Sequence, residues 1–177
     1  IQPGQRVLDL ACGTGDLARA ASHAGARVVG LDITPRMIEL ARQKSTGSRA
    51  QWLVGDMGLL PTRSQAFDLV TTGYGLRNVP DLPVALREIA RTLGPGGRLL
   101  SLDFNRPESR VVRAVYLAYL TVVGSALGIV LHGDADTYRY IPASIRRYPG
   151  AAGVARLLRE AGFSRVDVHP VLGGLMT

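Results

Sequence analysis

The sequence has little cysteine, lysine and aromatic residue, and each shortage excludes a class of protein. The single cysteine, Cys12, excludes a disulfide scaffold and a CxxC zinc site, and it suits a reducing cytoplasm. Aromatic residues make up 6% of the chain and are not interleaved with basic residues, so a nucleic-acid binder is the weakest hypothesis. Lys44 stands beside twenty arginines in a chain of net charge +7. Codon bias in a GC-rich genome produces the same excess, so the charge by itself names no partner.

What the chain contains is a regular alternation of apolar runs and helical patterns within 177 residues, the length of one domain. Thr34 followed by Pro35 is typical of a helix start. The predicted strands are 6–10, 27–31, 51–54, 67–72, 98–104 and 166–171, and the predicted helices are 16–23, 35–43, 81–93 and 151–161. This order predicts an α/β fold, a Rossmann-like, doubly wound and mostly parallel sheet with helices on both faces.

One segment does not fit the alternation. Residues 114–131 carry no charge, and by length alone they are a marginal candidate for a membrane span. Gly124, Ser125 and Gly128 weaken a helix in the middle of the segment, which also lies between two elements of the α/β pattern. We therefore expect a buried helix followed by a loop over an apolar pocket.

A glycine loop follows the first predicted strand and is the strongest chemical signal. Gly13 and Gly15 allow a tight turn and close approach of a ligand, at the strand end where open α/β sheets bind ligands. The pattern Gly13-x-Gly15-x-x-Ala18 also matches the dinucleotide fingerprint, and Asp32 follows the second strand. The loop alone therefore fits both a nicotinamide dinucleotide and S-adenosylmethionine.

Charge separates these two ligands. Asp9 and Asp16 flank the loop and would repel a pyrophosphate, whereas S-adenosylmethionine carries a sulfonium and an ammonium. Asp32 suits the ribose hydroxyls of either ligand. Asp56, at the end of the third strand, can accept a hydrogen bond from the adenine amine while Met57 packs on the ring. Acidic residues at three successive strand ends therefore favour S-adenosylmethionine.

The strings VLDLACGTGD, FDLVTT and LGPGGRLL resemble the class I S-adenosylmethionine-dependent methyltransferases. The more specific strings GLRNV at 75–79 and DADTYRY at 134–140 resemble the ubiquinone/menaquinone biosynthesis C-methyltransferases, over essentially the whole chain. Against that family's pattern, Gly73-Tyr74 stands where Ser precedes an aromatic residue. The printed sequence also lacks the family's N-terminal helical segment and stops before its last strand would finish.

The resemblance implies a class I methyltransferase fold, S-adenosylmethionine as cofactor, no metal, and an acceptor with a polyprenyl tail. Arg77 and Asn78 would lie on the substrate side of the cleft. The candidate cofactor-binding residues are Asp9, Gly13, Thr14, Gly15, Asp32, Ile33, Asp56, Met57 and Gly73.

Methylation of a ring carbon needs an electron-rich quinol held close to the methyl group. Arg77 suits the stabilisation of a phenolate, and Asn78 can orient a quinol oxygen. Tyr138, the third candidate catalytic residue, and Tyr140 can line the acceptor pocket. His132 is expected to be a surface histidine, and the sequence assigns no general base.

The uncharged residues 114–131 would have a function if the acceptor has a long apolar tail. We expect one domain, 1–177, with a substrate-side insertion or lid at 106–148. Its apolar surface would admit the tail, while Arg106, Arg110 and Arg113 would contact anionic headgroups. These features predict a cytoplasmic protein at the inner face of a membrane, and a homodimer is a further expectation.

Three alternatives stay open at this stage. The chain could methylate a soluble small molecule, transfer hydride to a nicotinamide, or bind the cofactor without turnover. The sequence also leaves open whether the ring is a benzoquinol or a naphthoquinol.

Overall fold

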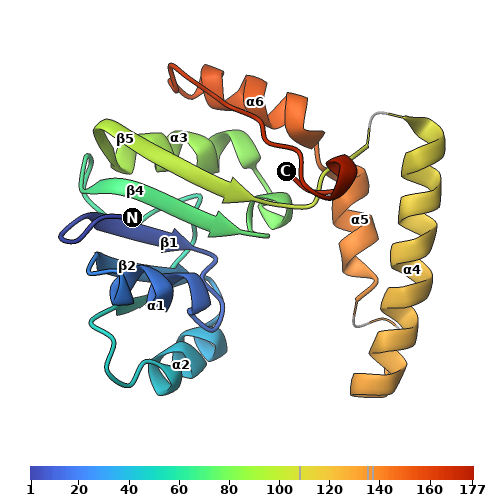
Figure 1. Cartoon of the computed structure of the whole chain (residues 1–177), viewed down its shortest axis with the longest axis horizontal. Helices are drawn as coiled ribbons and strands as arrows, with labels where there is room; N and C mark the ends of the chain where they lie inside the picture. The colour runs from blue at the N-terminus through green and yellow to red at the C-terminus, as the bar shows by residue number, and fades with distance from the viewer. Residues whose placement is uncertain (108, 135, 137) are drawn as a thin grey trace. The chain divides into compact units, whose positions relative to one another are not determined.

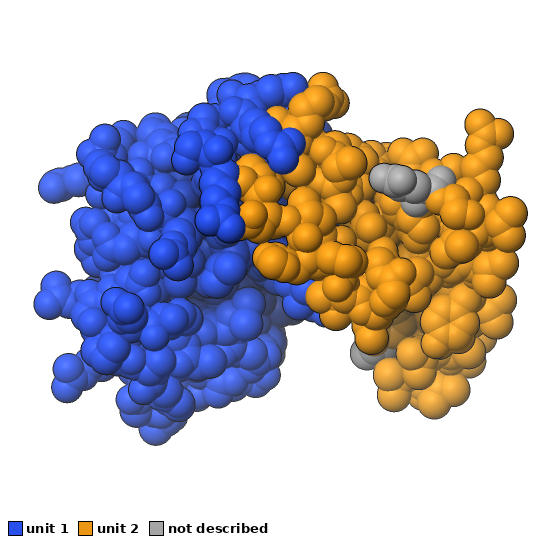
Figure 2. Space-filling view, turned by 45° about the horizontal axis from the view of Figure 1, so that its top comes forward, with its two compact units in different colours: residues 1–103, 157–165 blue, residues 104–156, 166–177 orange. Residues whose placement is uncertain are grey.

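The computed structural model describes residues 1–107, 109–134, 136 and 138–177 (Figure 1). Ala135 and Thr137 of the string 134–140 lie outside the described residues, and so does the side chain of His132. The chain divides into two compact units, coloured separately in Figure 2. Unit 1 comprises 1–103 and 157–165, and unit 2 comprises 104–156 and 166–177. Each unit is described by itself.

Unit 1 is built on a parallel sheet. Its described strands are β1 (Arg6–Leu10), β2 (Arg27–Asp32), β3 (Gln51–Val54), β4 (Phe67–Gly73) and β5 (Leu93–Leu102). They lie in the order β3-β2-β1-β4-β5, and every pair is parallel (Figure 1). The chain order reverses between β1 and β4, which is the topological switch point where such sheets bind ligands. The predicted doubly wound, parallel α/β fold is confirmed.

The helices of this part of the chain begin and end near the predicted positions. They are α1 (Asp16–His23), α2 (Pro35–Lys44) and α3 (Leu82–Thr92). The short η1 (Leu76–Asn78) was not predicted, and α6 (Gly150–Glu160), close to its predicted range, has residues in both units. Thr34 is the N-cap residue of α2, and the Asp81 carboxylate caps α3 by accepting from the N–H of Val84 at 3.0 Å. Figure 1 shows α1 in front of the sheet and α3 behind it, so β1 is buried on both faces.

Two strand predictions differ from the structure. The fifth strand was expected at 98–104 but already begins at Leu93, because an edge strand with an irregular register tolerates Pro95. The expected strand at 166–171 is wrong, since these residues form no strand, and Val171 makes only an isolated bridge to Met176. Alternating valines favour a strand, but the chain turns at η2 (Leu172–Gly174), where Gly173 has φ 65°, before a ladder can extend.

Unit 2 contains α4 (Arg110–His132) and α5 (Tyr140–Arg147). The expectation of a buried helix followed by a loop is wrong, because α4 continues for 23 residues through Gly124 and Gly128. Gly124 has a packing reason, since a Cβ there would lie 3.3 Å from the Cβ of Tyr138.

The α4 helix is long and apolar enough to cross a membrane by composition, yet only 17% of its apolar window is buried. Tyr116 and Leu117 pack with Ile145 of α5, and most other large side chains of α4 are exposed. The residues expected as an insertion, 106–148, fall within unit 2, and their function as a lid stays a prediction.

Candidate functional site

Loops from four strands of unit 1 meet at the carboxyl edge of the sheet. The N–H of Gly13, after β1, donates to Oδ2 of Asp32, at the end of β2, over 2.9 Å. A Cβ on Gly75, after β4, would lie 2.8 Å from the Cβ of Ala11 and 3.4 Å from Cε of Met57. The sequence therefore brings residues from 9 to 75 into one site, as their positions at strand ends predict.

The two glycines of the first loop serve different purposes. Gly15 has φ 84°, and a Cβ there would lie only 2.2 Å from Cη2 of Trp52 on β3. Gly13 has φ 54°, and nothing lies within 4 Å of the place where its Cβ would be. Gly15 is thus required by packing, whereas Gly13 leaves open space through which a ligand can approach the backbone. The sequence pattern does not mark Trp52 as a site residue, because an isolated tryptophan in a strand is typical of any core.

The carboxylate of Asp9 is only partly satisfied by hydrogen bonds. Its side chain is buried, and Oδ1 accepts a hydrogen bond of 2.7 Å from the Thr71 hydroxyl. Oδ2 has no hydrogen-bond partner among the described residues. Burial raises the pKa of Asp9 to about 6, in spite of the opposing effect of the Thr71 hydroxyl. A buried carboxylate in this state favours a cationic ligand.

Cys12 is chemically quiet in the same loop. Burial, together with the nearby charges of Asp9 and Asp32, raises the pKa of its thiol to about 12. The thiol therefore stays protonated at neutral pH and is no nucleophile, as expected for a small loop residue.

Asp32 and Thr14 are tied to their own loops. The Asp32 carboxylate accepts from the N–H groups of Gly13 and Thr34, both at 2.9 Å, which fixes its direction and leaves further lone pairs for ligand hydroxyls. The Thr14 hydroxyl accepts from Nζ of Lys44 at 3.1 Å, so its cofactor contact stays a prediction. Ile33, next to Asp32, is 66% exposed.

The loop after β3 presents Asp56 and Met57. Oδ1 of Asp56 accepts from the N–H of Gly58 at 2.8 Å, and Met57 is buried. Arg91, on α3, holds the following turn by donating to the carbonyls of Leu60 and Thr62 at 3.1 and 2.9 Å. The sequence pattern does not mark Arg91, because a basic residue on an amphipathic helix is typical of an ordinary exposed surface.

Glu88 completes this support from the same helix. Its carboxylate pairs with Arg91 at 2.8 Å and accepts from the N–H of Leu60 at 2.9 Å. The hydrogen bond from Arg91 lowers the pKa of Glu88, so the carboxylate stays charged at neutral pH. The cofactor-side loop is therefore fixed from α3 by two side chains.

Arg77 is buried in an ion pair rather than exposed at the cleft. Its guanidinium lies 2.7 Å from Oδ1 of Asp103, and the two side chains are 3% and 4% exposed. The guanidinium also donates to the carbonyl of Tyr74 at 3.0 Å and lies 5.7 Å from the centre of that ring. Tyr74 has φ 60°, a strained conformation for a residue other than glycine. The pair therefore joins the ends of β4 and β5, and direct contact with an acceptor stays a prediction.

Asp103 could have been found from the sequence. It lies at the carboxyl end of a strand, as Asp9, Asp32 and Asp56 do, but its string matched no cofactor role. Its burial beside Arg77 gives it a structural function at the same edge of the sheet.

The remaining candidates divide between the two units. Asn78 is exposed and donates from Nδ2 to the carbonyl of Tyr74 at 3.2 Å. Gly73 is half-buried, and a Cβ there would lie 3.4 Å from Cδ1 of Leu17. Tyr138 belongs to unit 2, beside Gly124, and its catalytic function stays a prediction.

The groups at this edge fit S-adenosylmethionine. They offer a partnerless carboxylate oxygen on Asp9, acidic side chains at the ends of three strands, and an open backbone at Gly13. The carboxylates Asp9 and Asp32 would repel the pyrophosphate of a dinucleotide. Within the described part of the chain, no group of three or more His, Cys, Asp or Glu residues could hold a metal ion.

The sheet order and this acidic edge define a class I S-adenosylmethionine-dependent methyltransferase. A solved S-adenosylmethionine-dependent methyltransferase from Aquifex aeolicus has the same fold, with TM-score 0.70 at 18% identity over 99% of this chain and 80% of that one. The YcgJ protein from Bacillus subtilis matches with TM-score 0.61 at 30% identity, over 68% of this chain and 53% of that one.

The chain belongs to the ubiE/COQ5 methyltransferase family, whose family model matches residues 1–177. It is 44% identical to a 2-phytyl-1,4-naphtoquinone methyltransferase from Thermosynechococcus vestitus, over 98% of this chain and 78% of the relative. It is 39% identical to the ubiquinone/menaquinone biosynthesis C-methyltransferase UbiE from Ectopseudomonas mendocina, over 99% and 72%. The expected family, enzyme class and cofactor are thus confirmed.

Proposed function

We propose that this protein methylates a ring carbon of a polyprenylated quinol, such as demethylmenaquinol or a ubiquinol precursor. The observation that carries the proposal is the match of the whole chain to relatives named as quinone methyltransferases. S-Adenosylmethionine supplies an electrophilic methyl group when it is bound. The residues of this chain bind it, orient the acceptor and exclude water.

On the cofactor side, each carboxylate has its own part. Asp32, held by two backbone N–H groups, accepts from the ribose hydroxyls. Asp56 accepts from the adenine amine, and Met57 packs on the ring. Asp9 faces the cationic part of the cofactor, because its buried second oxygen has no partner among the described residues.

On the acceptor side, the Arg77–Asp103 pair positions the backbone of Tyr74. The exposed amide of Asn78 orients a quinol oxygen from that turn. Loss of the hydroxyl proton makes the neighbouring ring carbon a stronger nucleophile. Arg77 has the positioning function given above, and its direct stabilisation of the resulting charge is the alternative tested in the Discussion. Tyr138 stays the third candidate catalytic residue, on the strength of the family resemblance alone.

The α4 helix accommodates the tail of the acceptor. Its exposed apolar side chains give a long hydrocarbon a surface that water solvates poorly. They are Val111, Val112, Val115, Tyr119, Val122, Leu127, Ile129, Val130 and Leu131. We place the protein on the cytoplasmic face of a membrane, with residues 106–148 as the substrate-side lid. A homodimer stays a prediction.

Methyl transfer from S-adenosylmethionine to three acceptors tests the proposal. We expect demethylmenaquinol or a demethylated ubiquinol precursor to gain one methyl group by mass spectrometry, and a ring without a tail to react more slowly. Asp32→Ala is the matched control, which loses cofactor binding. Faster methylation of a soluble phenol, or calorimetric binding of NAD instead of S-adenosylmethionine, would contradict the proposal. Quinones from a strain lacking the protein should lack one methyl group, and the ring that lacks it identifies the acceptor.

A further inference from the structure

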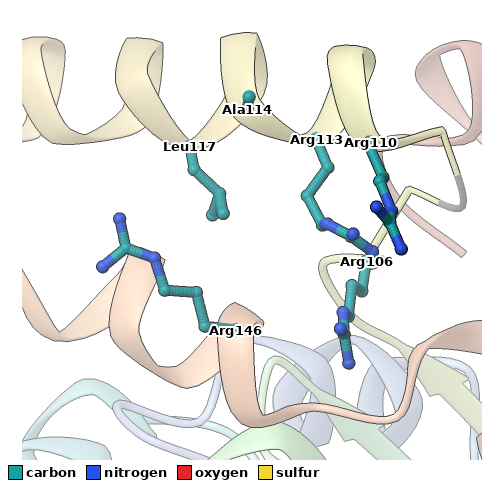
Figure 3. A pocket seen from close by; sticks show the side chains of 6 residues that line it. All are labelled: Arg106, Arg110, Arg113, Ala114, Leu117 and Arg146. Atoms are coloured by element: carbon teal, nitrogen blue, oxygen red, sulfur yellow. The ribbon is translucent and has the colours of Figure 1, made fainter.

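Four arginines line one cavity of unit 2. The cavity has a volume of about 350 Å³ and is lined by Arg106, Arg110, Arg113 and Arg146, together with Ala114 and Leu117 (Figure 3). Arg106 comes from the segment before α4, Arg110 and Arg113 from the first turn of α4, and Arg146 from α5. Three separate segments therefore contribute arginines to the lining of the cavity, with Arg110 and Arg113 side by side and the Arg146 guanidinium on the opposite side, towards Leu117 (Figure 3).

These four arginines differ from the six arginines that form ion pairs in the described part of the chain. Arg6, Arg19, Arg36, Arg77, Arg91 and Arg139 each pair with a carboxylate. No ion pair within the described residues involves any of the four, and no carboxylate of a described residue lines the cavity. Glu108, close to them in the sequence, lies outside the described residues.

The placement of these charges is electrostatically unfavourable for the ligand-free protein. Arg110 and Arg113 lie at the N-terminus of a 23-residue helix, where the helix dipole is already positive and disfavours cations. Arg106 and Arg146 add two further like charges to the same cavity. A bound anion would relieve this repulsion, so the arrangement favours an anionic ligand over a purely structural function.

The cavity is also held by a built framework. Oδ1 of Asn105 accepts from the N–H groups of Arg106 and Ala151, at 2.8 and 2.9 Å, and its Nδ2 donates to the carbonyl of Gly174 at 2.9 Å. The backbone of Arg106 is thus fixed to two distant segments of unit 2. Arg113 donates to the carbonyl of Pro107 at 3.4 Å, and both arginine side chains are half-buried.

The lining indicates the chemistry of the ligand. Guanidinium groups bind phosphate oxygens in bidentate geometry, and four cations exceed what one carboxylate needs. Ala114 and the buried Leu117 add an apolar wall, and Val111 and Val115 lie exposed on the same helix. A small inorganic ion would leave this apolar wall exposed to water, whereas a ligand with a hydrocarbon part would cover it.

We propose that the four-arginine cavity is a binding site for the phosphate group of an anionic amphiphile, of the chemical class of the glycerophospholipids. The site lies within residues 106–148, which are proposed as the substrate-side lid, but it uses none of the cofactor-binding residues at the carboxyl edge of the sheet, so lipid binding and methyl transfer are measured separately. A phospholipid bound here would lie against α4.

Calorimetry with soluble probes tests this site on the full chain. The probes are monomeric dihexanoyl phosphatidylglycerol, inorganic phosphate and dihexanoyl phosphatidylcholine, each titrated at low salt. We expect phosphatidylglycerol to bind most tightly, because it fills both the cationic and the apolar parts of the cavity. The double variant Arg113→Gln/Arg146→Gln should weaken this binding roughly tenfold or more.

A charge-matched variant provides the control. Arg63→Gln/Arg147→Gln removes two exposed arginines that do not line the cavity, and should change binding by less than about twofold. Arg113→Lys/Arg146→Lys should retain part of the binding, since it keeps the charge but loses the bidentate geometry. Binding of S-adenosylmethionine, measured on the same samples, should be equal in all variants and so shows that each is folded.

Three results would overturn the proposal. One is no binding of phosphatidylglycerol by the unmodified protein, and another is an equal loss in the control variant. The third is inorganic phosphate binding as tightly as the lipid, which would assign the cavity to free phosphate. None of these results bears on methyl transfer to a quinol, so the two proposals fail separately.

Discussion

At Asp9, folding favours the protonated carboxyl group, whereas binding of a cationic cofactor favours the charged carboxylate. Its pKa of about 6 in the folded chain lies above the ordinary value of 3.8, so the folded state binds the proton more tightly than the unfolded state. This contribution to the unfolding free energy is complete below about pH 4 and is lost as the pH rises through about 6. The loss is about 3 kcal/mol. A cationic ligand beside the carboxylate would recover part of that loss.

We therefore expect Asp9→Asn to stabilise the ligand-free protein at about pH 8 by about 1 kcal/mol, because no charge is then buried. The same change should weaken S-adenosylmethionine binding roughly tenfold or more, because the carboxylate faces the cationic part of the cofactor. Urea unfolding at acidic and alkaline pH, together with calorimetry, measures both effects. A variant that is destabilised at alkaline pH, or that binds the cofactor normally, would contradict this assignment.

Variants of the Arg77–Asp103 pair test whether Arg77 contacts the acceptor or positions the turn at Tyr74. Asp103→Asn keeps the guanidinium but leaves it without its buried counter-ion, so we expect a loss of about 3 kcal/mol in unfolding free energy. If Arg77 positions the turn at Tyr74, Asp103→Asn and Arg77→Lys should both raise the acceptor KM. If Arg77 instead contacts the acceptor, only Arg77→Lys should lower kcat strongly.

An exposed ion pair provides the comparison. Arg6 and Asp68 form a pair at 2.5 Å whose side chains are 47% and 40% exposed. Arg6→Gln should therefore change the unfolding free energy by less than about 1 kcal/mol and leave both kinetic constants unchanged. Equal effects of Arg6→Gln and Asp103→Asn would show that burial of the second pair is unimportant.

At the scale of the elements, the glycine loop depends on the strand beneath it. Gly15→Ala places a Cβ within 2.2 Å of the Trp52 ring at φ 84°, so we expect a loss of about 3 kcal/mol or more in unfolding free energy. Trp52→Phe in the same chain should recover part of this loss, because the smaller ring leaves the contact. Thermal and urea unfolding of the single and double variants measure the coupling.

Gly13→Ala is the matched control within the same loop. Its Cβ would meet nothing within 4 Å, and only the positive φ remains, so the loss should be about 1 kcal/mol and insensitive to Trp52→Phe. Equal losses at Gly13 and Gly15 would mean that backbone conformation alone, and not the tryptophan, requires the second glycine.

The elements of unit 1 are predictable from sequence because local and global signals agree. Buried parallel strands give continuous apolar runs, and Thr34-Pro35 and Asp81 mark helix starts that the structure confirms. The elements of unit 2 are less predictable. Gly124 and Gly128 suggest a break in α4, but a long apolar helix tolerates them, and the valines of 166–171 find no strand to pair with.

The candidate site shows the same division. Residues at strand ends, such as Asp9, Asp32 and Asp56, are found from position alone, because parallel strands carry their ends to one edge. Supporting residues are missed, since Trp52 and Arg91 act through contacts with segments far away in the sequence. Sequence patterns identify groups that face a ligand better than groups that hold those groups in place.

At the scale of the whole molecule, the net charge of +7 and the exposed apolar helix predict a common behaviour. A cationic protein approaches an anionic surface through long-range attraction, and α4 then adds contacts that salt does not screen. We expect flotation with vesicles containing phosphatidylglycerol at about 0.05 M NaCl, and several-fold less at about 0.5 M, where the Debye length is short. Neutral phosphatidylcholine vesicles should bind far less protein at either concentration.

Val115→Asp/Val122→Asp separates the apolar contribution from the charge. Both side chains are exposed, at 65% and 69%, so the variant should fold and bind S-adenosylmethionine normally. Its flotation should fall at both salt concentrations, because aspartate opposes burial in lipid and also lowers the net charge. Arg36→Asp provides the control: its charge changes by the same two units, at an exposed site on α2, so any loss from charge alone appears there. If the two variants float equally well, α4 does not enter the lipid, and the attraction is that of the net charge alone.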